Sequence, residues 1–241
     1  MSYSGFDNEN DLIKALNNQT INQLNDNLQS LLKSTFTNYN GNILCNKQAG
    51  KNKSDLEIII GDEVHTFSVK KGTGNSVHQE PVNQFVDFLV KNYNISKELQ
   101  NDILFFIWGD KTLDGSGNIK DRIGAREFVK LYPDIIDRLC VFFDSIKSDL
   151  INRFVINGVD SDLVSSEFIY YGGVGSGICC KADKALEWLC EHKSSGAIAV
   201  GRLSFQAWNR ALNGGKSEHK RGQIQLKWAT IKEDIEKISN E

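Results

Sequence analysis

The sequence predicts an α/β fold in which helices flank a mixed central β-sheet and a β-hairpin lies near the end of the chain. Two β-rich runs within 56–70 meet across a Gly-Asp turn, which is typical of a hairpin. Apolar residues recur at helical spacing over 8–35 and 125–155. Two more strand-like runs fall within 202–231. We expect one domain over residues 1–241, because no Pro-rich or Gly/Ser-rich linker divides the chain.

The first half of the chain alternates between helical and strand patterns. The helical pattern of 8–35 carries Asn-Asn-Gln-Thr at 17–20, which can split it into two helices. The predicted elements that follow are a loop or weak strand over 36–53, hairpin strands over 56–60 and 64–70, and a helix over 77–93.

The second half is predicted in the same way. Its expected elements are helices over 97–109 and 125–155, a strand over 163–171, a glycine-rich turn at 172–177 before a helix over 181–192, and strands over 202–210 and 223–231 joined by a basic loop. The glycine run lacks the Gly-Lys-Ser/Thr ending of a phosphate-binding P-loop, so it is interpreted as a turn.

Composition sets limits on the class of protein. With 241 residues, 24% charged and 40% hydrophobic, the chain has an ordinary globular composition. The net charge of −3 argues against a protein that coats nucleic acid by bulk positive charge. A net charge of this size is still compatible with a local basic groove.

The sequence also predicts a cytoplasmic protein that does not bind membranes. Apolar runs stay well below the roughly 18 residues needed to span a bilayer. The polar N-terminus lacks the pattern of a secretory signal. Five cysteines without paired spacing indicate reduced thiols.

The hairpin over 56–70 carries the strongest chemical signal. Asp55 stands at the start of one strand, and Ser68 and Lys70 share a face late on the other. These side chains can therefore meet at one end of the sheet. A carboxylate suits Mg²⁺, which prefers oxygen ligands, and the Val69 carbonyl is a further candidate ligand. Lys70 could orient or deprotonate the attacking water.

Two glutamates are candidates for an additional acid. Glu9 opens the first predicted helix and could give another oxygen ligand to the metal, and Glu80 is the alternative. Both also have an ordinary explanation, because acids are favoured at helix N-termini. The sequence leaves open which of them is used, and whether one metal ion or two are bound.

The C-terminal region concentrates positive charge. Residues 201–228 contain six lysines and arginines against one acid, together with amide side chains that can bond base edges. The candidate DNA contacts here are Arg202, Gln206, Asn209, Arg210, Lys216, Lys220, Arg221, Gln223, Gln225 and Lys227. The alternative is an edge hairpin whose charges prevent aggregation.

The pattern S-D-x12-S-x-K over 54–70 resembles the motif of PD-(D/E)XK nucleases, with Ser54 in place of the proline and Ser68 in place of the second acid. The order of GFDNEND, the hairpin motif, NIKDR and GRLSFQ…RGQIQLKW resembles small type II restriction endonucleases over most of the chain. The nearest group by this resemblance is the MspI-like one, which includes GCGC-cutting enzymes.

The resemblance implies a restriction-endonuclease-like fold with a catalytic core over about 1–110 and a DNA-recognition part over about 160–241. It implies Mg²⁺-dependent hydrolysis of double-stranded DNA at a site of about four bases, for which GCGC is a candidate. Asp55, Lys70, Ser68 and Glu9 would be catalytic.

The resemblance also assigns the contacts to DNA. A residue shortly after the lysine would contact the minor groove, and the candidates are Asn75, His78 and Gln79; Lys71 is a further candidate DNA contact. The closing hairpin would read the major groove. A cognate methyltransferase would be a genetic partner, and the enzyme would act as a monomer or a dimer.

Two other functions stay open at this point. The chain could be a DNA-binding protein with an inactive nuclease fold, which the replacement of the second acid by Ser68 favours. It could also be a nuclease of repair or of a mobile element.

Overall fold

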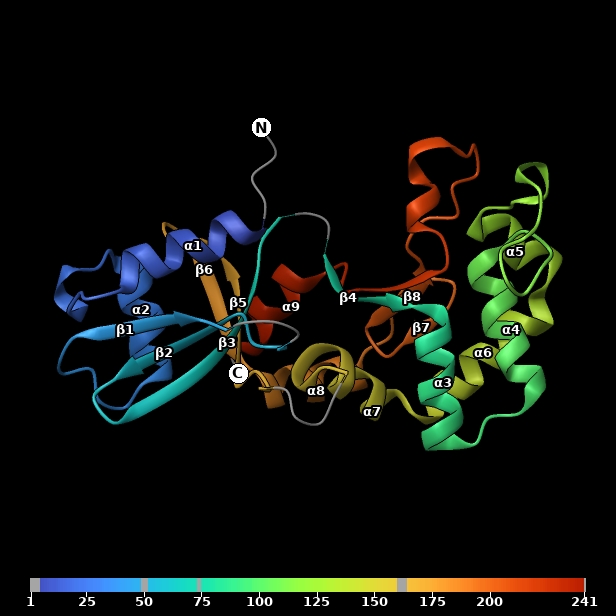
Figure 1. Ribbon diagram of the computed structural model, residues 1–241. Coiled ribbons are helices and arrows are strands. Elements are labelled where there is room, and N and C mark those ends of the chain that lie inside the picture. The colour runs from blue at the N-terminus through green and yellow to red at the C-terminus, as the bar shows by residue number, and fades with distance from the viewer. Residues whose placement is uncertain (1–4, 49–51, 73–74, 160–163, 241) are drawn as a thin grey trace. The chain divides into compact units, whose positions relative to one another are not determined.

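The chain folds as a mixed α/β protein with two β-sheets (Figure 1). The structure is a computed structural model that describes residues 5–48, 52–72, 75–159 and 164–240. The predicted α/β class is confirmed, although the sequence did not predict a second sheet.

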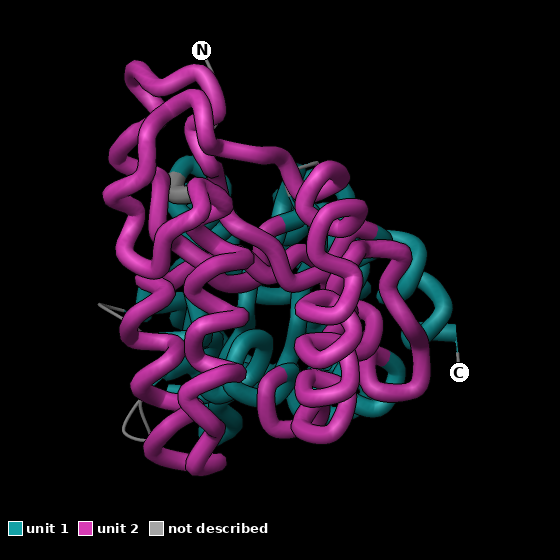
Figure 2. Tube along the Cα trace, turned by 90° about the vertical axis from the view of Figure 1, so that its right-hand side faces the viewer, with its two compact units in different colours: residues 1–75, 151–188, 230–241 teal, residues 76–150, 189–229 magenta. Residues whose placement is uncertain are grey.

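The chain divides into two compact units, each assembled from segments that are far apart in sequence (Figure 2). Unit 1 comprises residues 1–75, 151–188 and 230–241, and unit 2 comprises 76–150 and 189–229. Compact units are not the same as independently folding domains, so the single endonuclease domain stays a prediction.

Unit 1 contains a five-stranded mixed sheet with the order β1-β2-β3-β5-β6. Its strands are β1 (Ile43–Lys47), β2 (Leu56–Ile60), β3 (Glu63–Lys70), β5 (Phe168–Gly172) and β6 (Gly177–Lys181). The pairing of β3 with β5 is parallel and the other pairings are antiparallel. The predicted hairpin is therefore confirmed as β2 and β3, at the centre of a mixed sheet.

The helices of unit 1 are α1 (Gly5–Leu16), α2 (Asp26–Thr35), α8 (Ala182–Glu191, ending in unit 2) and α9 (Ile231–Ile238), with a 3-10 turn at Ile21–Gln23 and a π-helical segment at Asn152–Asn157. Of these, α1, α2 and α9 pack against the sheet. The predicted break at 17–20 is confirmed. Asn25 then caps α2, because its side chain accepts a hydrogen bond of 2.9 Å from the Leu28 N–H.

The core of unit 1 lies between the sheet and its first two helices (Figure 1). Alternate strand residues face this core, as expected for one face of a sheet. They include Ile58 and Ile60 on β2, Phe67 and Val69 on β3, and Tyr170 on β5.

The parallel pair β3–β5 places two chain segments at the same end of the sheet. Lys70 lies opposite Tyr171 in the register, so the residues that follow both strands emerge together. The start of β2 is at this end as well, since Leu56 pairs with Phe67. Asp55, Lys70 and the glycine-rich turn at 172–177 therefore share one end of the sheet.

Unit 2 contains a four-stranded antiparallel sheet with the order β4-β9-β8-β7. The strands are β4 (Ser76–Pro81), β9 (Gln223–Lys227), β8 (Leu203–Ala207) and β7 (Ala199–Val200). The predicted C-terminal hairpin is confirmed as β8 and β9, although both strands are shorter than expected.

One predicted helix boundary is wrong. Residues 76–81 form β4 instead of the start of a helix, because this segment pairs with β9 and buries Val77 and Glu80. The helix begins only after Pro81, a residue that restricts the one before it to extended backbone. The helix predicted over 181–192 is confirmed as α8 (Ala182–Glu191), although the sequence did not predict strand β6 between it and the turn at 172–177.

The helices of unit 2 enclose a cluster of phenylalanines. They are α3 (Val82–Tyr93), α4 (Lys97–Trp108), α5 (Ala125–Leu131), α6 (Pro133–Ser145) and α7 (Lys147–Ile151, ending in unit 1), with 3-10 turns at Ile119–Asp121 and Gly215–Lys220. The cluster consists of Phe85, Phe106, Phe128, Phe143 and Phe205. Of the helices that the structure describes, none is long and apolar enough to cross a membrane.

We expect Phe205→Ala to be among the costliest single changes in unit 2. The ring is 2% exposed and its centroid lies 4.8 Å from that of Phe143 and 5.5 Å from that of Phe85. Removing it should lower the free energy of unfolding by about 3–5 kcal/mol, measured by urea denaturation. Val141→Ala is the control, because Val141 is 73% exposed, and equal effects of the two changes would contradict this packing.

Candidate active site and nucleic-acid interface

Asp55 is the centre of the candidate active site in unit 1. Its backbone N–H donates to the Phe67 carbonyl at 2.8 Å, which extends the β2–β3 ladder by one residue. The side chain therefore reaches the last residues of β3. Its Oδ2 accepts hydrogen bonds from the Val69 N–H at 2.6 Å, the Lys70 Nζ at 3.1 Å and the Ser68 hydroxyl at 3.3 Å.

The structure thus brings four of the predicted site residues together. Lys70 Nζ also donates to the Val69 carbonyl at 3.2 Å, so the ammonium lies between two candidate metal ligands. Ser68 is buried, whereas the Asp55 and Lys70 side chains are 24% and 23% exposed. A substrate can therefore reach the carboxylate and the amine.

The donor set fits a magnesium ion that keeps water and substrate oxygens as ligands. All of the side-chain hydrogen bonds that described residues make to Asp55 fall on Oδ2, which leaves Oδ1 for a cation. The described residues contain no group of three or more His, Cys, Asp or Glu side chains that could hold a metal. Mg²⁺ is commonly held by one or two carboxylates and substrate phosphates, so Asp55 and the Val69 carbonyl suit it.

The two candidates for an additional acid lie in different units. Glu9 on α1 is in unit 1, where its Oε2 lies 2.9 Å from Nζ of Lys47 at the end of β1. Glu80 is in unit 2, buried, with its Oε1 3.1 Å from Nε2 of His78. A metal-binding role for either glutamate stays a prediction.

Lys53 is a charged neighbour of the site that sequence reasoning missed. Burial, then the positive charge of Lys70 and, more weakly, that of Arg153, lowers the pKa of Lys53 to about 7, although Asp55 opposes the shift. Lys53 stands two residues before Asp55, so its position in the sequence could have indicated that it lies close to the candidate active site. Arg153 comes from the π-helical segment, and no local pattern could have placed it here.

We expect the Lys53 amine to titrate near pH 7 in protein free of divalent cations, measured by NMR of the lysine Cε signals. Lys70→Gln removes a neighbouring cation and should raise the pKa of Lys53, whereas Asp55→Asn removes the anion and should lower it. Lys33→Gln on α2 is the control and should change nothing. A Lys53 titration at the ordinary value of about 10.4 would contradict this arrangement.

In unit 2, the sheet aligns three of the predicted DNA contacts. Gln79 on β4 lies opposite Gln225 on β9, which lies opposite Gln206 on β8. Directly opposite residues share a face of the sheet, so the three amides form a row across three strands. Gln206 Nε2 donates to Gln225 Oε1 at 2.8 Å; Gln225 is buried and Gln79 is exposed.

Two arginines of the predicted reading surface are used inside unit 2. Arg210 is 7% exposed, donates to the Phe106 carbonyl and lies over the Phe106 ring at 4.8 Å. Burial lowers its pKa to about 10. These contacts give Arg210 a role in packing, and its contact with DNA stays a prediction.

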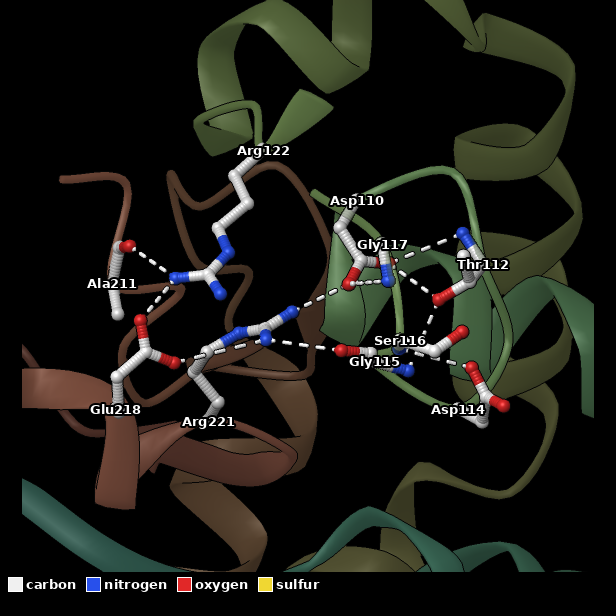
Figure 3. Close-up of polar contacts among 10 residues, drawn as sticks. All are labelled: Asp110, Thr112, Asp114, Gly115, Ser116, Gly117, Arg122, Ala211, Glu218 and Arg221. Atoms are coloured by element: carbon white, nitrogen blue, oxygen red, sulfur yellow. Dashed lines mark hydrogen bonds and ion pairs between the residues drawn. The ribbon is translucent and has the colours of Figure 1, made fainter. Parts of the chain in front are cut away.

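Arg221 belongs to a polar network that joins the loop after α4 to the loop before β9 (Figure 3). Its Nη2 lies 2.6 Å from Oδ2 of Asp110, and its Nη1 donates to the Gly115 carbonyl. The Asp110 side chain is fully buried. Burial acts to raise the pKa of Asp110, but hydrogen bonds from Thr112 and Arg221 hold it below its usual value.

A second ion pair supports the same loop. Arg122 Nη1 lies 2.5 Å from Oε1 of Glu218 and donates to the Ala211 carbonyl at 2.7 Å (Figure 3). Glu218, the single acid of the basic segment, therefore has a structural partner in Arg122. The loop that begins at Asp110 therefore supports the basic loop.

The other predicted contacts are distributed over the two units. Lys216 is exposed, Lys220 lies over the Trp208 ring at 5.1 Å, and Asn209 accepts a hydrogen bond from the Ala211 N–H. Half-buried positions are occupied by Arg202, Gln223 and Lys227 in unit 2 and by Asn75, which has a φ of 49°, in unit 1. Lys71, exposed in unit 1, donates to the Asn8 side chain at 3.2 Å.

We expect Arg221→Met to lower the free energy of unfolding by about 3–5 kcal/mol, because it leaves the Asp110 carboxylate buried without its cation. Asp110→Asn combined with Arg221→Met should recover a large part of this loss. Urea denaturation measures both. Arg126→Met, at an exposed position on α5, should stay within about 0.5 kcal/mol, and an equal loss in that control would refute the structural role of Arg221.

Comparison of the sequence with models of protein families gives no match, and comparison with curated proteins gives none at a significant level.

Proposed function

We propose that this protein is a Mg²⁺-dependent endonuclease that hydrolyses double-stranded DNA at a short specific site, with a PD-(D/E)XK-type active site. One observation carries the proposal. The Asp55 carboxylate, the Val69 carbonyl and the Lys70 ammonium meet within hydrogen-bond distance at one accessible end of the unit 1 sheet. This is the donor set that the resemblance of the S-D…S-x-K pattern leads us to expect.

Each group has a distinct part in the proposed reaction. A magnesium ion held by Asp55 and the Val69 carbonyl would supply positive charge against the phosphate oxygens and lower the pKa of a water. Lys70 would orient that water toward the phosphorus and stabilise the negative charge that develops there. Ser68 would keep Asp55 in place through its hydrogen bond to Oδ2.

The sheet of unit 2 supports a role in reading sequence. Glutamine side chains can form hydrogen bonds with base edges, and Gln79, Gln225 and Gln206 stand in one row. Lys216, on the exposed loop, carries positive charge suited to phosphates. We therefore assign base contacts to Gln79 and Gln206, with the buried Gln225 holding Gln206 in place through its hydrogen bond, and backbone contacts to the basic loop. The cut position and the recognition sequence, for which GCGC is a candidate, belong to this proposal.

The second candidate is a DNA-binding protein with an inactive nuclease fold. The observation that favours it is Ser68, which is buried and donates to Asp55 where the motif has a second acid. Cleavage of plasmid DNA in Mg²⁺ separates the two candidates, because both would bind DNA but only the first would cut it.

We expect Asp55→Asn and Lys70→Gln each to lower the cleavage rate at least 100-fold, because each removes a group that acts on the reacting phosphate. Specific binding in Ca²⁺ should persist in both variants. The matched controls in unit 1 are Asp62→Asn in the β2–β3 turn and Lys33→Gln on α2, which should cut at the wild-type rate. Full activity of either active-site variant would overturn the assignment.

A further inference from the structure

A cleft of about 740 Å³ opens in unit 1 beside the turn that joins β5 to β6. Its lining includes that turn (172–177), Asn27 on α2, Tyr171 on β5, Lys71 after β3 and Lys232 on α9. Two of the lining residues are lysines, and no Asp or Glu is among those that the structure describes. Lys232 Nζ is 3.7 Å from Oε1 of Glu236 on the same helix and its side chain is 60% exposed. The cleft therefore carries net positive charge.

The glycines let the backbone of the turn approach its neighbours closely. A Cβ atom on Gly173 would lie 2.9 Å from both Lys71 Nζ and the Asn8 side-chain oxygen. A Cβ atom on Gly177 would overlap the Tyr170 hydroxyl. A Cβ atom on Gly175 would meet nothing within 4 Å, so this position faces open space.

Several carbonyl oxygens of the turn accept hydrogen bonds, including that of Ser176 from the Gly173 N–H at 2.8 Å, whereas several N–H groups of the turn do not donate to described residues. Gly172 O accepts from Asn8 at 2.8 Å, Gly173 O from the Tyr170 hydroxyl at 2.6 Å and Val174 O from the Asn25 and Asn27 amides. Within the described part of the chain, the N–H groups of residues 174–176 have no protein acceptor. Consecutive backbone N–H groups in a turn can form an anion-binding concavity.

The cleft lies at the same end of the sheet as the candidate active site. β3 and β5 are parallel and Lys70 is paired with Tyr171. The Tyr171 hydroxyl donates to the Gly72 carbonyl at 2.9 Å, which ties the segment after Lys70 to β5. Lys70 contacts Asp55, and the next residue, Lys71, lies against the glycine turn.

We propose that this cleft binds a phosphodiester group of the DNA backbone next to the one that is cleaved, through the N–H groups of residues 174–176 and the ammonium groups of Lys71 and Lys232. The inference rests on the proposed function, because it takes DNA as the ligand. It assigns a use to the glycine run, which sequence analysis treated as a turn alone.

The test is a matched pair of changes at Gly175. Its φ lies outside the left-handed region and its Cβ position is open, so Gly175→Asp and Gly175→Asn should both fold, with equal thermal midpoints. Binding of a fluorescent DNA duplex is measured by anisotropy in Ca²⁺ at several salt concentrations. We expect Gly175→Asp to bind about tenfold more weakly at about 0.1 M salt, because it places a carboxylate beside the phosphate, and Gly175→Asn to stay within about twofold of wild type.

A lysine pair supplies an independent readout. Lys232→Gln should reduce the magnitude of the slope of log affinity against log salt by about one, because one phosphate contact is lost. Lys33→Gln removes a lysine of the same unit that does not line the cleft and should leave the slope unchanged.

The outcomes separate this inference from the proposed function. Equal binding by Gly175→Asp and Gly175→Asn, or equal slopes for the two lysine variants, would overturn the phosphodiester site while leaving cleavage by wild type intact. If inorganic phosphate binds the protein, and Gly175→Asp weakens that binding without changing DNA binding, free phosphate is the ligand. This result would also overturn the phosphodiester site. Retained DNA binding with the expected variant effects, but no cleavage in Mg²⁺, would support the site and overturn the nuclease. A wild-type protein that binds no duplex would overturn both.

Discussion

The contact between Asp55 and Lys70, at 3.1 Å, is the interaction on which the rest of the account depends. It exists because β2 and β3 pair in a register that sets Leu56 opposite Phe67 and lets Asp55 extend the ladder by one residue. A slip of one residue would turn Lys70 to the other face of the sheet. The buried residues of β2 and β3 therefore determine the positions of Asp55 and Lys70 as well as the packing of the core.

The two units divide the proposed work between them. Unit 1 holds Asp55, Ser68 and Lys70 at the end of a mixed sheet, with the glycine-rich turn beside them. Unit 2 holds an antiparallel sheet whose glutamine row and basic loop are suited to nucleic acid. The net charge of −3 hides this arrangement, because residues 201–228 hold six lysines and arginines against one acid, whereas the rest of the chain holds 22 against 30 acids.

Local patterns predicted much of the fold and of the candidate site. The alternation over 56–70 and the turn within it were enough to place Asp55, Ser68 and Lys70 together. The sequence could not show that 76–81 would pair with β9, about 145 residues later, because strand pairing over such a distance leaves no local pattern. For the same reason, no local pattern indicated that Arg221 would pair with Asp110, and Lys53 acquires its low pKa only from its folded surroundings.

The measurement that tests the central claim most directly is digestion of a natural plasmid by the wild-type protein in Mg²⁺, followed by sequencing of the fragment ends. A type II nuclease should give discrete fragments whose ends share one short sequence, and EDTA should abolish the reaction. Intact plasmid at high enzyme concentration, or a smear of unrelated ends, would contradict the account.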